Sequence, residues 1–248
     1  MLDQSFPTLL DYLRPFEHGG GYTDDYKAWL ATVETEDELN GGGDIHAPIF
    51  ESLLSGRHFK TAFEWCAGPA WIGLWLLERG ICDELVTGDI NPRTVELVKK
   101  TAKKHGYKVR SYLSDNMKSI PSWEKFDLVV GGPPNYCNIQ ESHRHGWLRN
   151  DLRAIDRDWN IHADFYNNIR PHLFDHSMMY ISEVSPYDKE VYLEKSLYDL
   201  REELPINEFV RMTERNGLRI KEAIPYEFSV FIKDDGVDCR MLEIEVKG

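Results

Sequence analysis

From about residue 45 onward, short apolar runs alternate with longer stretches in which apolar residues recur every three or four positions. The runs are typical of buried strands, and the stretches are typical of helices that cover a sheet. The expected strands are 61–66, 84–87, 107–113, 126–130 and 178–183, and the expected helices are 45–54, 70–79, 91–105 and 162–173. This alternation predicts an α/β fold with a mainly parallel, Rossmann-like sheet that is covered on both faces.

The two ends of the chain follow different patterns. After a helix expected at 207–216, strand patterns at 218–224, 227–233 and 240–246 predict an antiparallel edge, with Asp234-Asp235-Gly236 as a turn. Residues 1–44 carry two glycine runs and short helical patterns at 6–16 and 26–33. We therefore divide the chain into an N-terminal helical extension (1–44) and a main domain (45–248). The extension is either a packed decoration or a lid over a site.

Charge and composition narrow the classes of partner. The 248 residues include 29 lysines and arginines and 42 aspartates and glutamates, which gives a net charge of −13. A field of that sign repels nucleic acid and anionic membranes, and no apolar run approaches the ~18 residues of a membrane span. The four cysteines lack paired or zinc-ligand spacing, so we expect reduced thiols. A cytoplasmic protein is predicted, and its oligomeric state stays open.

The ends of the predicted strands carry the candidate chemistry, because ligands of open α/β sheets bind beyond the carboxyl ends of the strands. A dinucleotide fingerprint, G-x-G-x-x-G, is poorly matched, since that register contains Cys66, Gly68 and Trp71. Instead, an acidic residue precedes a turn of small residues, and further acids end the next strands. The residues are Glu64 with Cys66, Gly68 and Ala70, then Gly88, Asp89 and Pro92, then Asp115 and Asn116.

These motifs, in this order over residues 45–246, resemble the class I S-adenosylmethionine-dependent methyltransferases. The resemblance implies that the turn at 66–70 lies against the methionine part of the cofactor and that Glu64 lies near its amino group. It also implies that Asp89 holds the ribose hydroxyls and that Asp115 and Asn116 hold the adenine. The full expected cofactor site is Glu64, Cys66, Ala67, Gly68, Ala70, Asp89, Ile90, Asp115, Asn116 and Gly131.

The charge of this cofactor agrees with the residue types. S-adenosylmethionine is positively charged at sulfur and at its amino group and has no phosphate, so its site needs carboxylates rather than lysines. A carboxylate at a strand end can accept both ribose hydroxyls in charge-assisted hydrogen bonds. The alternative is that Glu64, Asp89 and Asp115 only cap the strands.

The sequence Gly-Gly-Pro-Pro-Asn-Tyr (131–136) resembles the N/D-P-P-Y/F motif of methyltransferases that act on planar nitrogens. The resemblance implies a catalytic loop made of Pro133, Pro134, Asn135 and Tyr136, stiffened by the two prolines. Gly132 stands where the family has Asn or Asp, and Asn135 stands at the aromatic position. A shifted loop in which Asn135 or Tyr136 supplies the missing group is one hypothesis, and a merely rigid turn is the other.

The following segment, 137–170, has five arginines and no lysine, which favours bidentate partners such as carboxylates or phosphates. Pairing with the acids of the same segment is the alternative. Tyr136, His143, Arg144 and His145 are the candidate substrate-binding residues. The His143/His145 pair lacks further ligands at metal spacing, so no metal is expected, and one of these histidines is a candidate general base.

The predicted function is methyl transfer to a nitrogen or carboxylate oxygen of a small polar or amino-acid-like substrate. A macromolecular target, a protein glutamine or an RNA base, is the alternative. The lysine stripe at 99–110 is by default a solvated helix face, and nucleic-acid contact is the alternative interpretation of it. A methyltransferase-like binding module without turnover is a further alternative, supported by the missing acceptor at Gly132.

Overall fold

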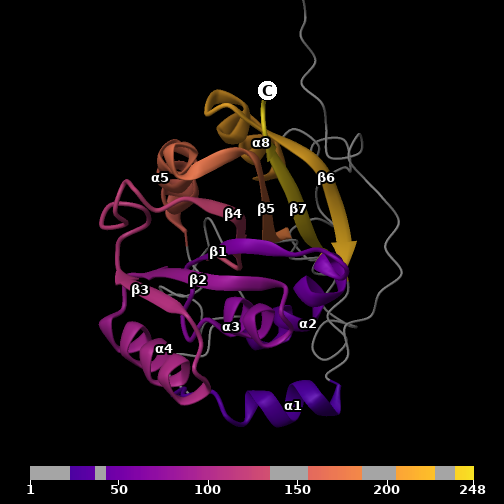
Figure 1. The fold of residues 1–248 in the computed structure, drawn as a ribbon. Helices are drawn as coiled ribbons and strands as arrows, with labels where there is room; N and C mark the ends of the chain where they lie inside the picture. Colours follow the sequence, from indigo (N-terminus) through magenta and orange to yellow (C-terminus); the bar gives the residue numbers. More distant parts are fainter. Residues whose placement is uncertain (1–22, 37–42, 135–155, 186–204, 227–237) are drawn as a thin grey trace, which may run out of the picture.

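The structure is a computed structural model that describes residues 23–36, 43–134, 156–185, 205–226 and 238–248. Its strands form one sheet in the order β3-β2-β1-β4-β5-β7-β6 (Figure 1). Strands β1 to β5 are parallel, and β7 is antiparallel to β5 and β6, which confirms the mixed sheet with an antiparallel C-terminal edge. The strands are β1 (Phe59–Trp65), β2 (Cys82–Asp89), β3 (Val109–Leu113), β4 (Phe126–Gly131), β5 (Leu173–Ser185), β6 (Leu218–Tyr226) and β7 (Asp238–Val246).

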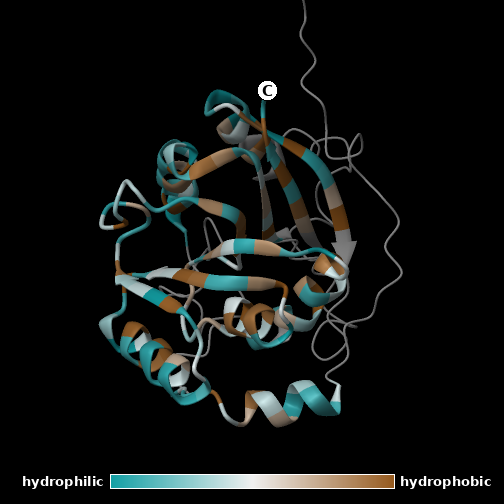
Figure 2. Cartoon of the chain, in the orientation of Figure 1, coloured by the Kyte–Doolittle hydropathy of each residue, from teal (hydrophilic) through white to brown (hydrophobic). Residues whose placement is uncertain are grey.

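Helices cover both faces of this sheet (Figure 1). One face carries α1 (Asp24–Leu30), α2 (Gly43–Leu54), α3 (Trp71–Glu78) and α4 (Pro92–His105), and the other carries α5 (Asn160–Ile169) and α8 (Pro205–Arg215). Apolar positions concentrate on the strands and on the sheet-facing sides of the helices (Figure 2). Because successive side chains of a strand point to opposite faces, two hydrophobic cores form, one on each side of the sheet.

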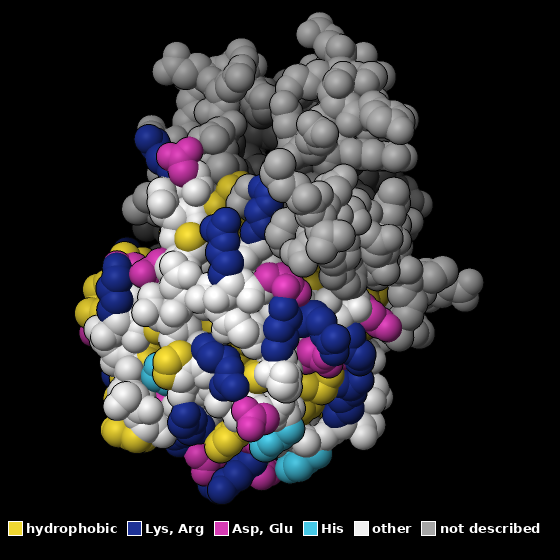
Figure 3. Space-filling view, turned by 90° about the horizontal axis from the view of Figure 1, so that it is seen from above, with side chains coloured by type: hydrophobic (Ala, Val, Ile, Leu, Met, Phe, Trp, Pro, Cys, Tyr) yellow, Lys and Arg dark blue, Asp and Glu magenta, His cyan; other side chains and the backbone are white. Residues whose placement is uncertain are grey.

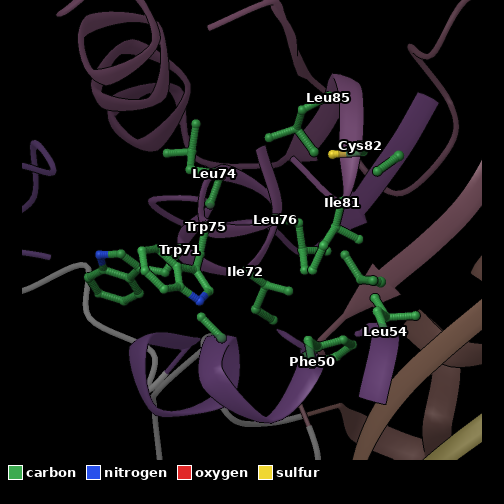
Figure 4. Packing of buried hydrophobic residues seen from close by; sticks show 14 of the residues in the cluster. Phe50, Leu54, Trp71, Ile72, Leu74, Trp75, Leu76, Ile81, Cys82 and Leu85 are labelled. Carbon is green, nitrogen blue, oxygen red and sulfur yellow. The ribbon is translucent and has the colours of Figure 1, made fainter. Parts of the chain in front are cut away.

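Helix α3 is the element that carries the first turn of the site, and it is buried on nearly all sides. Its apolar residues pack between β2 and α2, where Phe50 and Leu54 meet Ile72 and Leu76 (Figure 4). The indole N–H of Trp75 donates to Glu51 Oε2 of α2 at 2.7 Å. A helix that is apolar all round needs such a cover, and α2 provides it.

Some expected boundaries hold and others are wrong. Helix α4 begins after Asn91, whose side chain caps it, with Pro92 in the first turn and Gly106 in the left-handed conformation at its end, as the sequence predicts. The helix expected at 162–173 ends at 169, because Pro171 cannot continue it, and β5 begins at 173 instead of 178. The strand expected at 61–66 ends at Trp65, since Cys66 is left-handed.

Part of the N-terminal extension packs into the main core. Tyr26, Trp29 and Val33 are buried in the same cluster as α3, and the indole of Trp29 donates to Tyr107 Oη at 3.0 Å. Lys104 of the lysine stripe pairs with Glu34 at 3.0 Å. The described residues 23–36 therefore behave as a packed decoration. The helix expected at 6–16 and the strand expected at 227–233 lie outside the described residues, and the lid remains a prediction.

Candidate functional site

A cavity of about 500 Å³ opens at the carboxyl ends of β1, β2 and β3. This is the edge of a parallel sheet where ligands bind in α/β proteins, and the volume is typical of a cofactor site. The segments that follow these strands form most of the wall, together with the first turn of α3, the loop after β4 and the start of α5. The lining residues are 64–69, 71–72, 88–92, 94, 114–116, 132, 134 and 161.

The segment between β1 and α3 follows the cavity in an alternating left-handed conformation. Cys66, Gly68 and Ala70 have φ angles of 51°, 52° and 60°. This conformation costs a non-glycine residue about 1–2 kcal/mol, so Cys66 and Ala70 are held there by their surroundings. The G-x-G-x-G-like turn is therefore present as a backbone shape, although only its central residue is glycine.

Asp89 ties this turn to the end of β2. Its Oδ2 accepts the backbone N–H of Gly68 at 2.7 Å, and its Oδ1 accepts the backbone N–H of Asn91 at 2.8 Å. Each oxygen can accept a second hydrogen bond, because a carboxylate offers about four lone-pair sites. Asp89 is thus fixed in orientation by the backbone and still able to accept from a ligand in the cavity that it lines.

Glu64 lies on the other side of the same turn and is 3% exposed. Its Oε2 accepts the backbone N–H of Gly73 at 2.7 Å, which caps the first turn of α3. Burial raises the pKa of Glu64 to about 8, the hydrogen bonds from the backbone of Gly73 and Ile72 lower it, and the nearby charge of Asp89 raises it further. Near neutral pH the empty site therefore holds a largely protonated Glu64.

Asn116 joins the end of β3 to α5. It is left-handed, with φ of 50°, and its Oδ1 accepts the indole N–H of Trp65 at 2.8 Å. Its Nδ2 donates to the carbonyl of Ile161 at 3.1 Å and to Asp164 Oδ2 at 2.8 Å. The Asn116 amide is therefore used to hold the cavity wall together. Asp115 is half exposed and pairs with Lys118.

The cavity wall contains eight of the ten residues expected at a cofactor site; the exceptions are Ala70 and Gly131. Ala70 is fully buried at the start of α3. A Cβ at Gly131 would lie 3.1 Å from the carbonyl oxygen of Trp65, so this glycine allows β4 to approach β1. Of the expected catalytic loop, Pro134 lines the cavity and Pro133 is buried. Asn135, Tyr136, His143, Arg144 and His145 lie outside the described residues.

Several residues of this region had no signal in the sequence. Trp71 lines the cavity, and its buried indole Nε1 has no hydrogen-bond partner among the described residues. His46 of α2 is 8% exposed and lies beside Gly132. Both placements depend on tertiary packing. A buried polar atom facing a ligand cavity can only be recognised once the fold is known.

A buried charged cluster supports the wall from the α5 side. His162 Nδ1 lies 2.6 Å from Asp156 Oδ2, and its Nε2 lies 3.2 Å from Glu183 Oε2. Burial alone would lower the pKa of His162, but the charge of Glu183 and the hydrogen bonds to both carboxylates outweigh it and raise the pKa to about 9. His162 is therefore a cation that donates from both nitrogens. Its ring packs edge-on against the Trp65 ring, with 5.1 Å between the two ring centroids.

The electrostatics of the cavity favour a cation without phosphate. Among its lining residues are three acidic side chains, Glu64, Asp89 and Asp115, and neither lysine nor arginine. Burial raises the pKa of the Cys66 thiol well above its usual range, with the neighbouring carboxylates adding to the effect, so it stays neutral. In the described ranges, no group of three or more His, Cys, Asp or Glu residues is arranged to hold a metal. None of the helices described there is long and apolar enough to cross a membrane.

Comparisons with known proteins agree with this geometry. Residues 36–147 match the family model of the methyltransferase small domain. Among solved structures, the proposed RNA methyltransferase PH1948 from Pyrococcus horikoshii has a TM-score of 0.56 at 11% identity, covering 91% of this chain and 98% of that one. The ribosomal protein L11 methylase from Lactobacillus delbrueckii subsp. bulgaricus has a TM-score of 0.50 at 13% identity, covering 83% of this chain and 78% of that one. A comparison with curated protein sequences found no match.

At such identities the structural likeness shows the fold alone, and the family model adds the activity. The fold, the cavity at the strand ends and the matched domain agree with one another. The matched domain, residues 36–147, is that of a methyltransferase, and the chain is an S-adenosylmethionine-dependent methyltransferase with a Rossmann-like fold.

Proposed function

We propose that the cavity at the ends of β1, β2 and β3 binds S-adenosylmethionine and that the enzyme methylates a nitrogen or carboxylate oxygen of a small polar or amino-acid-like acceptor. The observation that carries the cofactor assignment is the set of three acidic side chains in a wall whose described residues include neither lysine nor arginine. A phosphate-bearing dinucleotide would meet repulsion there, whereas a sulfonium with an ammonium group meets attraction.

The contacts of each residue suggest its part in binding. Asp89 is oriented by two backbone N–H groups and would accept the ribose hydroxyls. Glu64 would face the amino group, and the Trp71 indole N–H would donate to the carboxylate of the methionine part. Ile90, 68% exposed at the cavity mouth, would lie against the adenine. Since the Asn116 amide is engaged by Trp65 and α5, we assign it to shaping the adenine pocket.

When bound, S-adenosylmethionine supplies a methyl group on a positively charged sulfur. Transfer of this group depends chiefly on holding the acceptor atom in line with the carbon–sulfur bond. Gly132 and Pro134 line the cavity next to Trp65, and the two prolines fix the loop backbone. This loop is the part of the described wall best suited to position an acceptor.

The charges on α4 and on the face seen in Figure 3 favour a small acceptor. Lys104 of the lysine stripe pairs with Glu34 of the packed N-terminal segment, and Arg93, which precedes the stripe on α4, pairs with Glu36. Part of the stripe therefore serves internal docking. On the face shown in Figure 3, lysines and arginines are interspersed with acidic side chains. A nucleic-acid enzyme would present a continuous basic surface to the phosphates.

RNA or protein acceptors are the second candidate. Two structures that share the fold carry such names, the proposed RNA methyltransferase of Pyrococcus horikoshii and the ribosomal protein L11 methylase. An acceptor screen separates the candidates: the enzyme is incubated with methyl-labelled S-adenosylmethionine and, separately, a pool of amines and amino acids, total RNA, or protein extract. Label in the small-molecule pool supports the proposal, and label confined to RNA or protein overturns its acceptor.

Calorimetry tests the cofactor site itself. Wild type should bind S-adenosylmethionine and S-adenosylhomocysteine, with NAD as the negative control. Asp89→Ala should weaken binding by at least about tenfold, because charge-assisted hydrogen bonds contribute about 1.5–3 kcal/mol. Asp83→Ala, at the opposite end of β2, is the matched control and should leave the affinity unchanged. Equal affinity in all three proteins would remove Asp89 from the site. Binding without methyl transfer to any pool would favour the non-catalytic module.

A further inference from the structure

Helix α2 places a histidine against the position in the catalytic loop that lacks a side chain. Gly132 follows β4, where the N/D-P-P-Y/F motif has Asn or Asp. A Cβ at Gly132 would lie 3.8 Å from Nδ1 and 3.9 Å from Cε1 of His46. The imidazole ring therefore lies in van der Waals contact with the position that a side chain at residue 132 would take.

The histidine is carried by a well-anchored element. Ala47, Ile49 and Phe50 of α2 are buried in the core against α3. The first turn of α2 is fixed from the other side, where the Tyr26 hydroxyl donates to the Asp44 carbonyl at 2.5 Å. His46 itself is 8% exposed. A buried imidazole on a rigid helix is held in a defined orientation, which a catalytic group requires.

The residue that His46 contacts is part of the cavity wall. Gly132 and Pro134 both line the cavity proposed for the cofactor. An acceptor held against Gly132 would therefore lie next to the residue that the imidazole contacts. In the related motif, a side chain at this position accepts a hydrogen bond from the target nitrogen, and here the described loop offers none from residue 132.

We propose that His46 replaces the missing side chain at Gly132 and is the general base of methyl transfer; this inference rests on the proposed function. As the acceptor nitrogen forms its bond to the methyl carbon, the carbon–sulfur bond breaks and its electron pair stays on sulfur, which becomes a neutral thioether. The N–H proton of the acceptor passes to a ring nitrogen of His46, which becomes an imidazolium. For a carboxylate acceptor no proton leaves, and His46 would only orient it.

The first test compares two ligands that differ only in the methyl group and the charge on sulfur. The side-chain NMR signal of His46, identified by its loss in His46→Gln, is recorded with saturating S-adenosylmethionine and with S-adenosylhomocysteine. It should differ between the two complexes, whereas His58, at the start of β1, should not change. If both ligands bind and the His46 signal is the same in both, the inference is overturned while the cofactor site stands. If neither ligand binds, the proposed function fails as well.

A residue exchange tests the chemical role with the acceptor pool that gives product. His46→Ala should lower the rate by about 100-fold or more, as expected for loss of a general base, with little change in S-adenosylhomocysteine affinity. Gly132→Asn alone should also lower the rate of methyl transfer, because the new side chain would contact the imidazole of His46. The double variant has room for the asparagine and should recover at least about tenfold over His46→Ala. The proposal is overturned if the rate of the double variant falls by the product of the two single losses. It is also overturned if the rates of His46→Ala and His46→Gln change by less than about threefold.

Discussion

Binding of the cofactor should release a proton from Glu64. The carboxyl group is buried beside the cavity, and burial raises its pKa to about 8. At pH 7 such a group is protonated in about 90% of molecules. An ammonium group placed next to it stabilises the carboxylate form, so the bound state favours the ionised acid. Binding then requires the proton to leave.

The magnitude follows from the pKa of the empty site. We expect release of about 0.9 proton per cofactor at pH 7 and about half a proton at pH 8. The affinity should rise with pH, because less proton must be displaced, by up to about tenfold per unit below pH 7.5, and level off above pH 8. If Glu64 were ionised both before and after binding, the affinity would not change with pH over this range.

Calorimetry with S-adenosylhomocysteine in buffers of different ionisation enthalpy measures this proton directly, since the observed heat varies with the buffer in proportion to the protons released. The range from pH 6 to 7.5 keeps the ligand amino group protonated. Glu64→Gln keeps an oxygen for the Gly73 N–H and should bind more weakly with no proton release. Glu96→Gln, on the exposed face of α4, should behave as wild type. Tight binding to wild type without proton release at pH 7 would refute the reasoning.

Three stability predictions can be checked by urea unfolding at pH 7. Gly73→Ala places a Cβ 2.4 Å from Leu85 Cδ1 and 2.7 Å from Glu64 Oε2, so we expect a loss of about 1–3 kcal/mol, and an unchanged stability would contradict the clash. His162→Ala leaves two buried carboxylates without their cation and should cost about 3–5 kcal/mol; a cost below 1 kcal/mol would mean that the cluster is not ionised. Trp29→Ala should cost about 3–5 kcal/mol if residues 23–36 belong to the fold, and an unchanged stability would show that they do not contribute.

The sequence predicts the fold well where local signals and the hydrophobic period agree. Helix α4 has a capping asparagine, a proline in its first turn and a closing glycine, and its bounds come out as expected. The prediction from sequence is wrong where a single residue ends an element although the apolar spacing continues. The apolar spacing of 162–173 continues past Ile169, but Pro171 ends the helix and the chain enters β5 five residues early.

The site divides along a similar line. Residues such as Asp89 and Glu64 follow parallel strands, and parallel strands bring their carboxyl ends to one edge, so their meeting around one cavity can be predicted from sequence. His46 precedes the first strand of the sheet and reaches Gly132 only because α2 packs on α3. Neither the hydrophobic period nor the spacing of motifs in the sequence predicts this contact.

The two sides of the cavity are therefore built by different means, and this bears on the domain boundary. The cofactor side uses carboxylates that backbone N–H groups of the sheet edge hold in place. The acceptor side uses a loop with no side chain at Gly132 and a histidine on α2, and α2 is in turn tied to α1 through Tyr26 and Asp44. A boundary after residue 44 cuts through α2 itself and separates Asp44 from His46. If His46 is the base, a change in the packing of α1 should alter the rate of methyl transfer more than the affinity for the cofactor.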